Sequence, residues 1–144
     1  MADDLQRTAE WLQERSGCFT GSVMADITNR NKKTGEKLAS FDERVWKVAY
    51  ERIAGRPMDS VSSRSLSWGT DVETFAVEKY ELETGNIVTP VGFIKHPKYD
   101  FVGCSADGLV GSDGAIEAKC PVNEVIHLRR FVEGVPSEYK PQCQ

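Results

Sequence analysis

Three side chains in the second half of the chain are suited to metal-assisted hydrolysis. Asp107 stands directly before Gly108, and Glu117 and Lys119 follow after a turn. Carboxylates are hard oxygen ligands that bind Mg²⁺, and the metal lowers the pKa of a bound water. A lysine beside that water can orient it and stabilise the hydroxide. This set of residue types therefore favours hydrolysis of an anionic substrate such as a phosphodiester.

A predicted β-hairpin is the element that brings these residues together. Residues 99–110 and 114–120 have the pattern of two strands joined by a Gly-Ser-Asp-Gly turn. Folding about this turn is expected to place Gly108 opposite Glu117, with Asp107 one residue away. Because side chains alternate along a strand, Glu117 and Lys119 are expected to share one face.

Each of these residues also has a simpler interpretation. An Asp-Gly pair at a strand end is often only a turn, and a Glu-x-Lys pair is often a solvated cross-strand pair. The alternating apolar residues argue for a half-buried strand whose polar face meets something other than water. Those apolar residues are Ile116, Ala118 and Cys120. Taken together, the residues favour the functional interpretation.

The remaining periodicity predicts helices before and after the strands. Helices are expected over residues 4–15, 23–27, 41–54 and 122–133, with another that starts near Val72 and ends by Gly85. A further helix is expected to begin at Ser137 or Glu138. Polar loops are expected over 28–40 and 58–65, and a strand broken by Pro90 over 87–94. This order of elements is typical of an α/β or α+β fold.

Composition excludes several classes of protein. With 40% hydrophobic residues among 144, the chain is expected to fold as a single domain over 1–144. No apolar run approaches the roughly 20 residues of a membrane span, and the acidic N-terminus does not resemble a secretion signal. The four cysteines form no Cys-x-x-Cys pair, which argues against a zinc site. A net charge of -4 argues against a passive DNA-coating protein.

The chain resembles the lambda exonuclease or YqaJ-like viral recombinase family of PD-(D/E)xK nucleases. The resemblance begins with Cys-Ser-Ala-Asp-Gly-Leu and Glu-Ala-Lys-Cys-Pro around Asp107 and Glu117. Three further family motifs occur in order along the chain. Trp-x-x-x-Arg-x-Gly-x-x-Thr-x-Ser starts at Trp11, Trp-Gly-x-x-x-Glu at Trp68, and Tyr-x-x-Gln-x-Gln at Tyr139.

The resemblance implies a fold and an activity. The expected fold is a restriction-endonuclease-like α/β core with a central mixed β-sheet flanked by helices. The expected activity is Mg²⁺-dependent degradation of linear double-stranded DNA from 5′ ends in phage-type recombination, with Mn²⁺ as a substitute ion. A single-strand-annealing partner protein, a ring-shaped homotrimer and a cytoplasmic location, in a bacterial cell or phage-infected host, are also implied.

The resemblance also assigns roles to individual residues. Asp107, Glu117 and Glu73 are implied as metal ligands, with Lys119 activating the water and Gln142 supporting it beside Tyr139 and Gln144. A pocket for the 5′-terminal phosphate is implied, and the residues that line it are Arg15, Ser22 and Ser105. Arginine and hydroxyl groups suit such a phosphate. Ser105 is expected on the same strand face as Asp107, two residues away.

Other interpretations of these residues remain open. Thr70-x-x-Glu73 also matches a helix-capping box, and Arg15 near a helix end also suits the helix dipole. Leu66 is assigned here as an apolar wedge between DNA strands, although such a leucine is usually part of a core. Gln142 also fits a polar helix face. The basic loop residues are candidate phosphate contacts or a solvated loop: Arg30, Lys32, Lys33 and Lys37.

Two rival functions stay open at this point. The first is a structure-selective or nicking endonuclease of the same fold, which needs no free 5′ phosphate. The second is a non-catalytic DNA-binding or regulatory remnant that forms mixed oligomers with a longer relative. Family members continue beyond the final glutamine motif, so this chain is expected to be a C-terminally shortened form.

Overall fold

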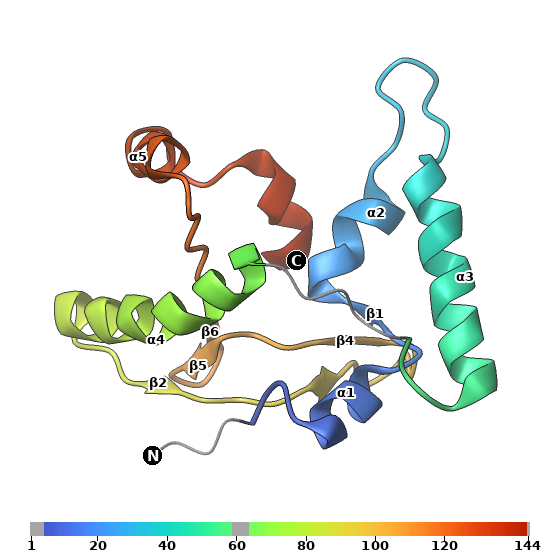
Figure 1. Cartoon of the computed structure of the whole chain (residues 1–144), viewed down its shortest axis with the longest axis horizontal. Helices are drawn as coiled ribbons and strands as arrows, with labels where there is room; N and C mark the ends of the chain where they lie inside the picture. Colours follow the sequence, from blue (N-terminus) through green and yellow to red (C-terminus); the bar gives the residue numbers. More distant parts are fainter. Residues whose placement is uncertain (1–4, 59–63, 144) are drawn as a thin grey trace. The chain divides into compact units, whose positions relative to one another are not determined.

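The fold was obtained as a computed structural model that describes residues 5–58 and 64–143 (Figure 1). Contacts divide these residues into two compact units. The first unit combines residues 5–58, 92–105 and 137–143, and the second combines 64–91 and 106–136. Each unit has its own sheet and its own helices. The expected organisation as one domain over 1–144 remains a prediction.

Helices make up most of the first unit. They are α1 (Ala9–Arg15), η1 (Gly21–Val23), α2 (Met24–Thr28), α3 (Ala39–Ala54) and η2 (Ser137–Cys143). The α2 helix lies between α3 and η2 and contacts both (Figure 1). The α3 helix ends where Gly55 adopts a left-handed conformation with φ of 65°, which glycine accepts without strain. The helix predicted over 41–54 is confirmed.

Three short strands form the sheet of the first unit, in the order β1-β4-β3. They are β1 (Phe19–Thr20), β4 (Val102–Cys104) and β3 (Ile94–Lys95). β1 runs parallel to β4, with Thr20 opposite Gly103, whereas β3 runs antiparallel to it. A Cβ on Gly103 would lie 2.3 Å from Cζ of Phe93 and 2.7 Å from the backbone carbonyl oxygen of Ile94, so glycine suits this close approach.

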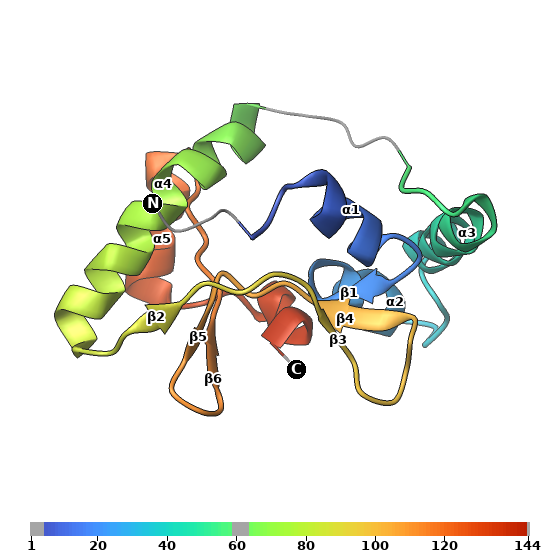
Figure 2. The ribbon, with the colours of Figure 1, turned by 90° about the horizontal axis from the view of Figure 1, so that it is seen from below.

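The second unit contains a long helix, an antiparallel sheet and a shorter helix. Its elements are α4 (Arg64–Thr84), β2 (Val88–Thr89), β5 (Gly108–Val110), β6 (Gly114–Ile116) and α5 (Glu124–Glu133). β5 and β6 form the predicted hairpin, and β2 pairs with the other edge of β5 (Figure 2). The side chain of Asn123 caps α5 by accepting a hydrogen bond from the backbone N–H of Ile126 at 3.0 Å.

Several predicted boundaries were wrong. The single strand predicted over 99–110 is two strands in different sheets, because the chain leaves β4 at Cys104 and joins β5 at Gly108. The segment 87–94 is likewise divided between β2 and β3. The loop predicted over 58–65 lies partly outside the described residues, and α4 has already begun at Arg64.

Few of the described apolar side chains are fully covered. Only Cys18 and Val48 are buried hydrophobic residues within the described ranges. Large apolar side chains on α3, α4 and α5 face solvent, among them Ile53, Leu82 and Phe131, each more than four-fifths exposed. Hydrogen bonds between polar side chains and distant backbone groups also hold the elements together.

Glu51 makes one such pair of hydrogen bonds in the first unit. Its buried carboxylate accepts hydrogen bonds from the backbone N–H of Gly17 at 2.9 Å and of Met58 at 3.0 Å. A charged acceptor satisfied by two backbone donors can be buried without a large penalty. This contact fixes α3 against the turn that leads from α1 into β1.

Candidate active site

Asp107 is held in place by the hairpin at two points. Its backbone N–H donates to the carbonyl of Ile116 at 3.0 Å, and its Oδ2 accepts from the backbone N–H of Ala118 at 2.6 Å. The strand register pairs Gly108 with Ile116, which places Asp107 opposite Glu117. The predicted register, with Gly108 opposite Glu117, was therefore wrong by one residue.

Glu117 and Lys119 lie beyond the end of their strand. β6 ends at Ile116, so the strand predicted over 114–120 is shorter than expected. The two side chains nevertheless meet, because Nζ of Lys119 donates to Oε1 of Glu117 in a short ion pair. Both side chains are partly covered, with exposed fractions of 34% for Lys119 and 23% for Glu117.

The charge of Glu73 on α4 also affects the pKa of Asp107. Burial, together with the negative charges of Glu117 and Glu73, raises the pKa of Asp107 to about 6. The Ala118 amide and the Lys119 ammonium act in the opposite direction, but more weakly in sum. The four predicted residues Asp107, Glu117, Lys119 and Glu73 thus face a common region of the second unit.

The negative charges of Glu73 and Asp107 also act on the thiol of Cys120. Burial is the main cause of a raised pKa at the Cys120 thiol, and the charges of Glu73 and Asp107 add to it. A thiol in such a negative field stays protonated at neutral pH. Oxygen ligands are therefore the ionised donors available in this region of the second unit.

The donor set fits a divalent cation in chemistry. Asp107, Glu117 and Glu73 are hard oxygen donors whose mutual repulsion a cation would relieve. Among the described residues, no three ligating side chains already stand close enough together to hold a metal. The carboxylates would have to draw together around an ion.

The capping-box interpretation of Glu73 is wrong. α4 runs from Arg64 to Thr84, so Thr70 and Glu73 lie within the helix and not at its first turn. A capping box requires the threonine to precede the first helical turn. Glu73 therefore lies inside α4, from where its charge acts on Asp107.

In the first unit, Trp11 connects two of the predicted phosphate ligands. Its indole Nε1–H donates to Oγ of Ser105 at 3.0 Å, and Cζ of the Arg15 guanidinium lies over its ring, 4.0 Å from the centre. From the sequence, Trp11 was known only as the first residue of a family motif. The tryptophan of that motif was the signal that pointed to it.

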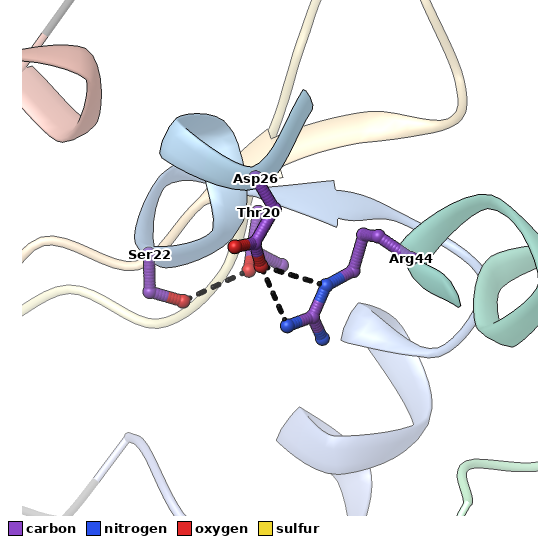
Figure 3. Close-up of polar contacts among 4 residues, drawn as sticks. All are labelled: Thr20, Ser22, Asp26 and Arg44. Carbon is purple, nitrogen blue, oxygen red and sulfur yellow. Dashed lines mark hydrogen bonds and ion pairs between the residues drawn. The ribbon is translucent and has the colours of Figure 1, made fainter. Parts of the chain in front are cut away.

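Ser22 lies near the end of the first unit's sheet at which β4 leads into Ser105. Ser22 and Ser105 follow the carboxyl ends of the neighbouring parallel strands β1 and β4. Oγ of Ser22 shares a 3.1 Å hydrogen bond with Oγ1 of the buried Thr20 (Figure 3). Parallel strands bring their carboxyl ends to one edge, so both hydroxyls lie at the same edge.

An ion pair fixes the helices behind this edge. Arg44 on α3 donates from Nη2 and Nε to Oδ2 of Asp26 on α2, at 2.8 and 3.2 Å (Figure 3). Both side chains are about one-third exposed. The pair thus holds the short α2 helix, which has only five residues, against α3.

Other predicted site residues are placed as follows. Gln142 lies in η2 and packs on Gly21, since a Cβ there would be 3.6 Å from Cγ of Gln142. Tyr139 belongs to the same short helix. Leu66 lies in α4, but its side chain is outside the described part of the structure, as is the whole of Gln144.

The basic loop has a structural function in part. Nη1 of Arg30 donates to the carbonyl oxygens of Ile27, Thr28 and Asn29 at 2.9 to 3.2 Å and so closes the end of α2. Nζ of Lys37 lies 4.1 Å from the centre of the Phe41 ring. Residues 28–37 are exposed, whereas Leu38 and Ser40 are partly covered. The loop predicted over 28–40 is therefore shorter than expected, because α3 begins at Ala39.

Comparison with known proteins identifies the family of the chain. The model of the YqaJ-like viral recombinase domain matches residues 10–144. The chain belongs to the YqaJ-like viral recombinase family. A search of curated proteins found no match.

Solved structures of an alkaline exonuclease from Laribacter hongkongensis (LHK-Exo) are similar to this YqaJ-like domain. The identity is 37% and the TM-score 0.81, over 94% of this chain and 64% of the exonuclease chain. A structure of LHK-Exo in complex with dAMP matches with the same identity and TM-score. The predicted α/β fold of the exonuclease type is confirmed, and the chain spans about two-thirds of that enzyme. No helix in the described part of the chain is long and apolar enough to cross a membrane.

Proposed function

We propose that this YqaJ-like domain is a metal-dependent deoxyribonuclease that digests linear double-stranded DNA from 5′ ends. The observation that carries the proposal is that the charges of Glu117 and Glu73 both act on the half-buried Asp107, while Lys119 is paired with Glu117. Membership of a viral recombinase family and 37% identity to an alkaline exonuclease support it. The activity is proposed for a chain that spans 64% of the solved enzyme.

The proposed ligands of the metal are Asp107, Glu117 and Glu73, and the proposed ion is Mg²⁺, with Mn²⁺ as a substitute. Bound there, the ion would stabilise negative charge on the phosphate oxygens and lower the pKa of a water. The Ala118 amide fixes the orientation of the Asp107 carboxylate, so less freedom is lost when the ligands gather.

Lys119 is the proposed residue for orienting the attacking water. An ammonium carries three N–H donors, so it can hold Glu117 and direct a second donor at the water oxygen. Its positive charge also favours the deprotonated form of that water. Gln142 is proposed to support the water, as in the family motif.

The proposed contacts to the DNA end involve the first unit and the start of α4. Arg15, Ser22 and Ser105 are proposed to bind the 5′-terminal phosphate, through a guanidinium and two hydroxyls. Leu66 is proposed as the wedge that separates the strands. A single-strand-annealing partner, a homotrimeric assembly and a cytoplasmic location complete the proposal.

A cleavage assay tests the proposal directly. The protein is incubated with Mg²⁺ and linear duplex DNA bearing 5′-phosphate or 5′-hydroxyl ends, and with a closed circular duplex. Progressive loss of the phosphorylated linear DNA, with the circle intact and EDTA abolishing the reaction, is the expected result. Lys119→Ala is expected to slow this reaction by about 10²- to 10⁴-fold, because the water loses its orienting group.

Two outcomes would count against the proposal in different ways. Cleavage of the closed circle would assign the site to an endonuclease of the same fold. Absence of cleavage, with wild type and Lys119→Ala indistinguishable, would show that the chain is not a nuclease by itself. Circular dichroism of both proteins confirms that the substitution has not unfolded the chain.

A further inference from the structure

Trp11 stands at the centre of a small network in the first unit. Its backbone N–H donates to Oγ1 of Thr8 at 3.1 Å, which fixes the residue at the start of α1. Its indole N–H and its ring face then contact Ser105 and Arg15, respectively. Ser105 is 94 residues away along the chain. One side chain therefore fixes two predicted phosphate ligands from different elements.

The hydrogen bond to Ser105 determines what that hydroxyl can do. An indole N–H only donates, so Oγ of Ser105 must accept at 3.0 Å. The hydroxyl proton of Ser105 is then directed away from the indole. A hydroxyl held in this orientation presents its proton to an acceptor such as a phosphate oxygen without first giving up rotational freedom.

The cation–π contact of Arg15 has a similar effect on its guanidinium. A guanidinium lying 4.0 Å from the ring centre is attracted by the π-face. The contact holds the Arg15 guanidinium beside Ser105, which bonds the same indole, and the planar fork of a guanidinium suits phosphate oxygens. The indole thus limits the conformations of a long side chain that would otherwise be costly to order.

We infer that Trp11 is the positioning residue that sets the preference for a 5′-phosphorylated end, by orienting Ser105 and Arg15 together. This inference rests on the proposed function of those two residues. The α1 helix that carries Trp11 is also bonded to the end of α3, since Nε2 of Gln13 donates to the carbonyl of Gly55 at 3.0 Å. Trp11 need not touch the DNA to act in this way.

The test compares binding of two DNA ends by wild type and Trp11→Phe. Fluorescence anisotropy in EDTA measures the Kd of the full chain for duplexes with a 5′-phosphate or a 5′-hydroxyl. Phenylalanine retains a ring for Arg15 but lacks the N–H, so the preference for phosphate is expected to fall about fivefold. Trp11→Leu removes both contacts and is expected to lower the preference roughly tenfold or more. Affinity for the hydroxyl end should stay the same.

Two further proteins separate positioning from a structural effect. Trp46→Phe is the matched control, because it makes the same change at an exposed tryptophan of the first unit, and it should leave the preference intact. The double variant Trp11→Phe with Ser105→Ala should bind phosphorylated ends no more weakly than Ser105→Ala alone. The indole N–H acts through that hydroxyl, so its loss should matter only while Ser105 is present.

The inference is overturned by any of three results. The first is that Trp11→Phe weakens binding of the phosphorylated and the hydroxyl end equally. The second is that the effects of Trp11→Phe and Ser105→Ala on binding add fully in the double variant. The third is that wild type shows no preference for a 5′-phosphate. Because the assay needs no cleavage, it is independent of turnover. Wild type that prefers phosphorylated ends but cuts no DNA with Mg²⁺ would refute the proposed nuclease while leaving the function of Trp11 intact.

Discussion

Replacing Asp107 by asparagine is expected to stabilise the metal-free protein while abolishing its activity. In the folded chain the pKa of Asp107 is about 6, against a usual value of 3.8. The ionised carboxylate is therefore less favourable in the fold than in the unfolded chain at neutral pH. Asparagine removes the charge and keeps an oxygen that can accept from the Ala118 amide.

The direction of the pH dependence follows from the same shift. A folded pKa above the unfolded one means that the fold binds more protons between about pH 4 and 6. The stability contributed by protonated Asp107 is therefore complete below about pH 4 and is lost as the pH rises through 6. The advantage of Asp107→Asn should grow over the same interval and stay constant above it.

The size of the effect follows from the pKa difference. A shift from 3.8 to about 6 corresponds to a ceiling of about 3 kcal/mol. Asp107 is only half-buried, and solvent screens part of its interactions. We therefore expect a gain of about 1–2 kcal/mol at pH 7.5 in EDTA, or roughly 3–6 °C in melting temperature.

Urea unfolding followed by circular dichroism, at pH 4.5, 6 and 7.5 in EDTA, measures the gain. Asp113→Asn is the matched control, since Asp113 lies exposed in the turn of the same hairpin. It should change the free energy of unfolding little at any pH. The reasoning would be refuted if Asp107→Asn were no more stable than wild type at pH 7.5, or if its advantage were the same at all three values.

Three further predictions concern metal binding by Asp107, the hydrogen bonds of Glu51 and the packing at Gly103. Mg²⁺ or Mn²⁺ should raise the melting temperature of wild type at pH 7.5, less so below pH 6 where Asp107 is protonated, and not that of Asp107→Asn; equal shifts would refute the assigned ligand. Glu51→Ala leaves the buried Gly17 N–H and the part-buried Met58 N–H without their acceptor and should cost about 2–4 kcal/mol in urea unfolding, whereas Glu43→Ala on the exposed face of α3 should cost little. Gly103→Ala places a Cβ against the Phe93 ring and the Ile94 carbonyl oxygen and should cost about 1–3 kcal/mol by the same measurement; a neutral result would refute the close approach at this position.

Local sequence was sufficient to predict those elements whose ends are fixed by their own residues. The helix over 41–54 has a regular apolar repeat and a glycine that stops it, and the hairpin has glycines on both sides of its turn. The helix predicted over 122–133 is found as α5 over Glu124–Glu133, after the cap at Asn123. In each case a short-range signal determines the structure, so the sequence pattern was enough.

Long-range packing decided the features that were missed. Gly108 lies against β2, where a Cβ would be 2.1 Å from Cγ1 of Val88, and this packing accompanies a register that differs by one from the local prediction. The break between β4 and β5 arises because the two strands pair with different neighbours. Neither cause is visible in the strand's own residues.

The candidate site divides in the same way. The approach of Asp107 to Glu117 and Lys119 follows from the hairpin and could be predicted, apart from its register. The approach of Glu73 depends on how α4 packs in the second unit, and only the family motif pointed to it. The contact of Trp11 with Ser105 spans 94 residues and has no local signal.

The hydrogen bond from Ala118 to Asp107 gives the metal site a spectroscopic reporter. A backbone amide whose acceptor is a carboxylate has a proton resonance that depends on the charge of that carboxylate. In a ¹⁵N–¹H spectrum, the Ala118 cross-peak is thus expected to move when Asp107 gains a proton and again when it binds an ion. A single backbone signal would then follow occupancy of the site in solution, in the absence of DNA and without any engineered label.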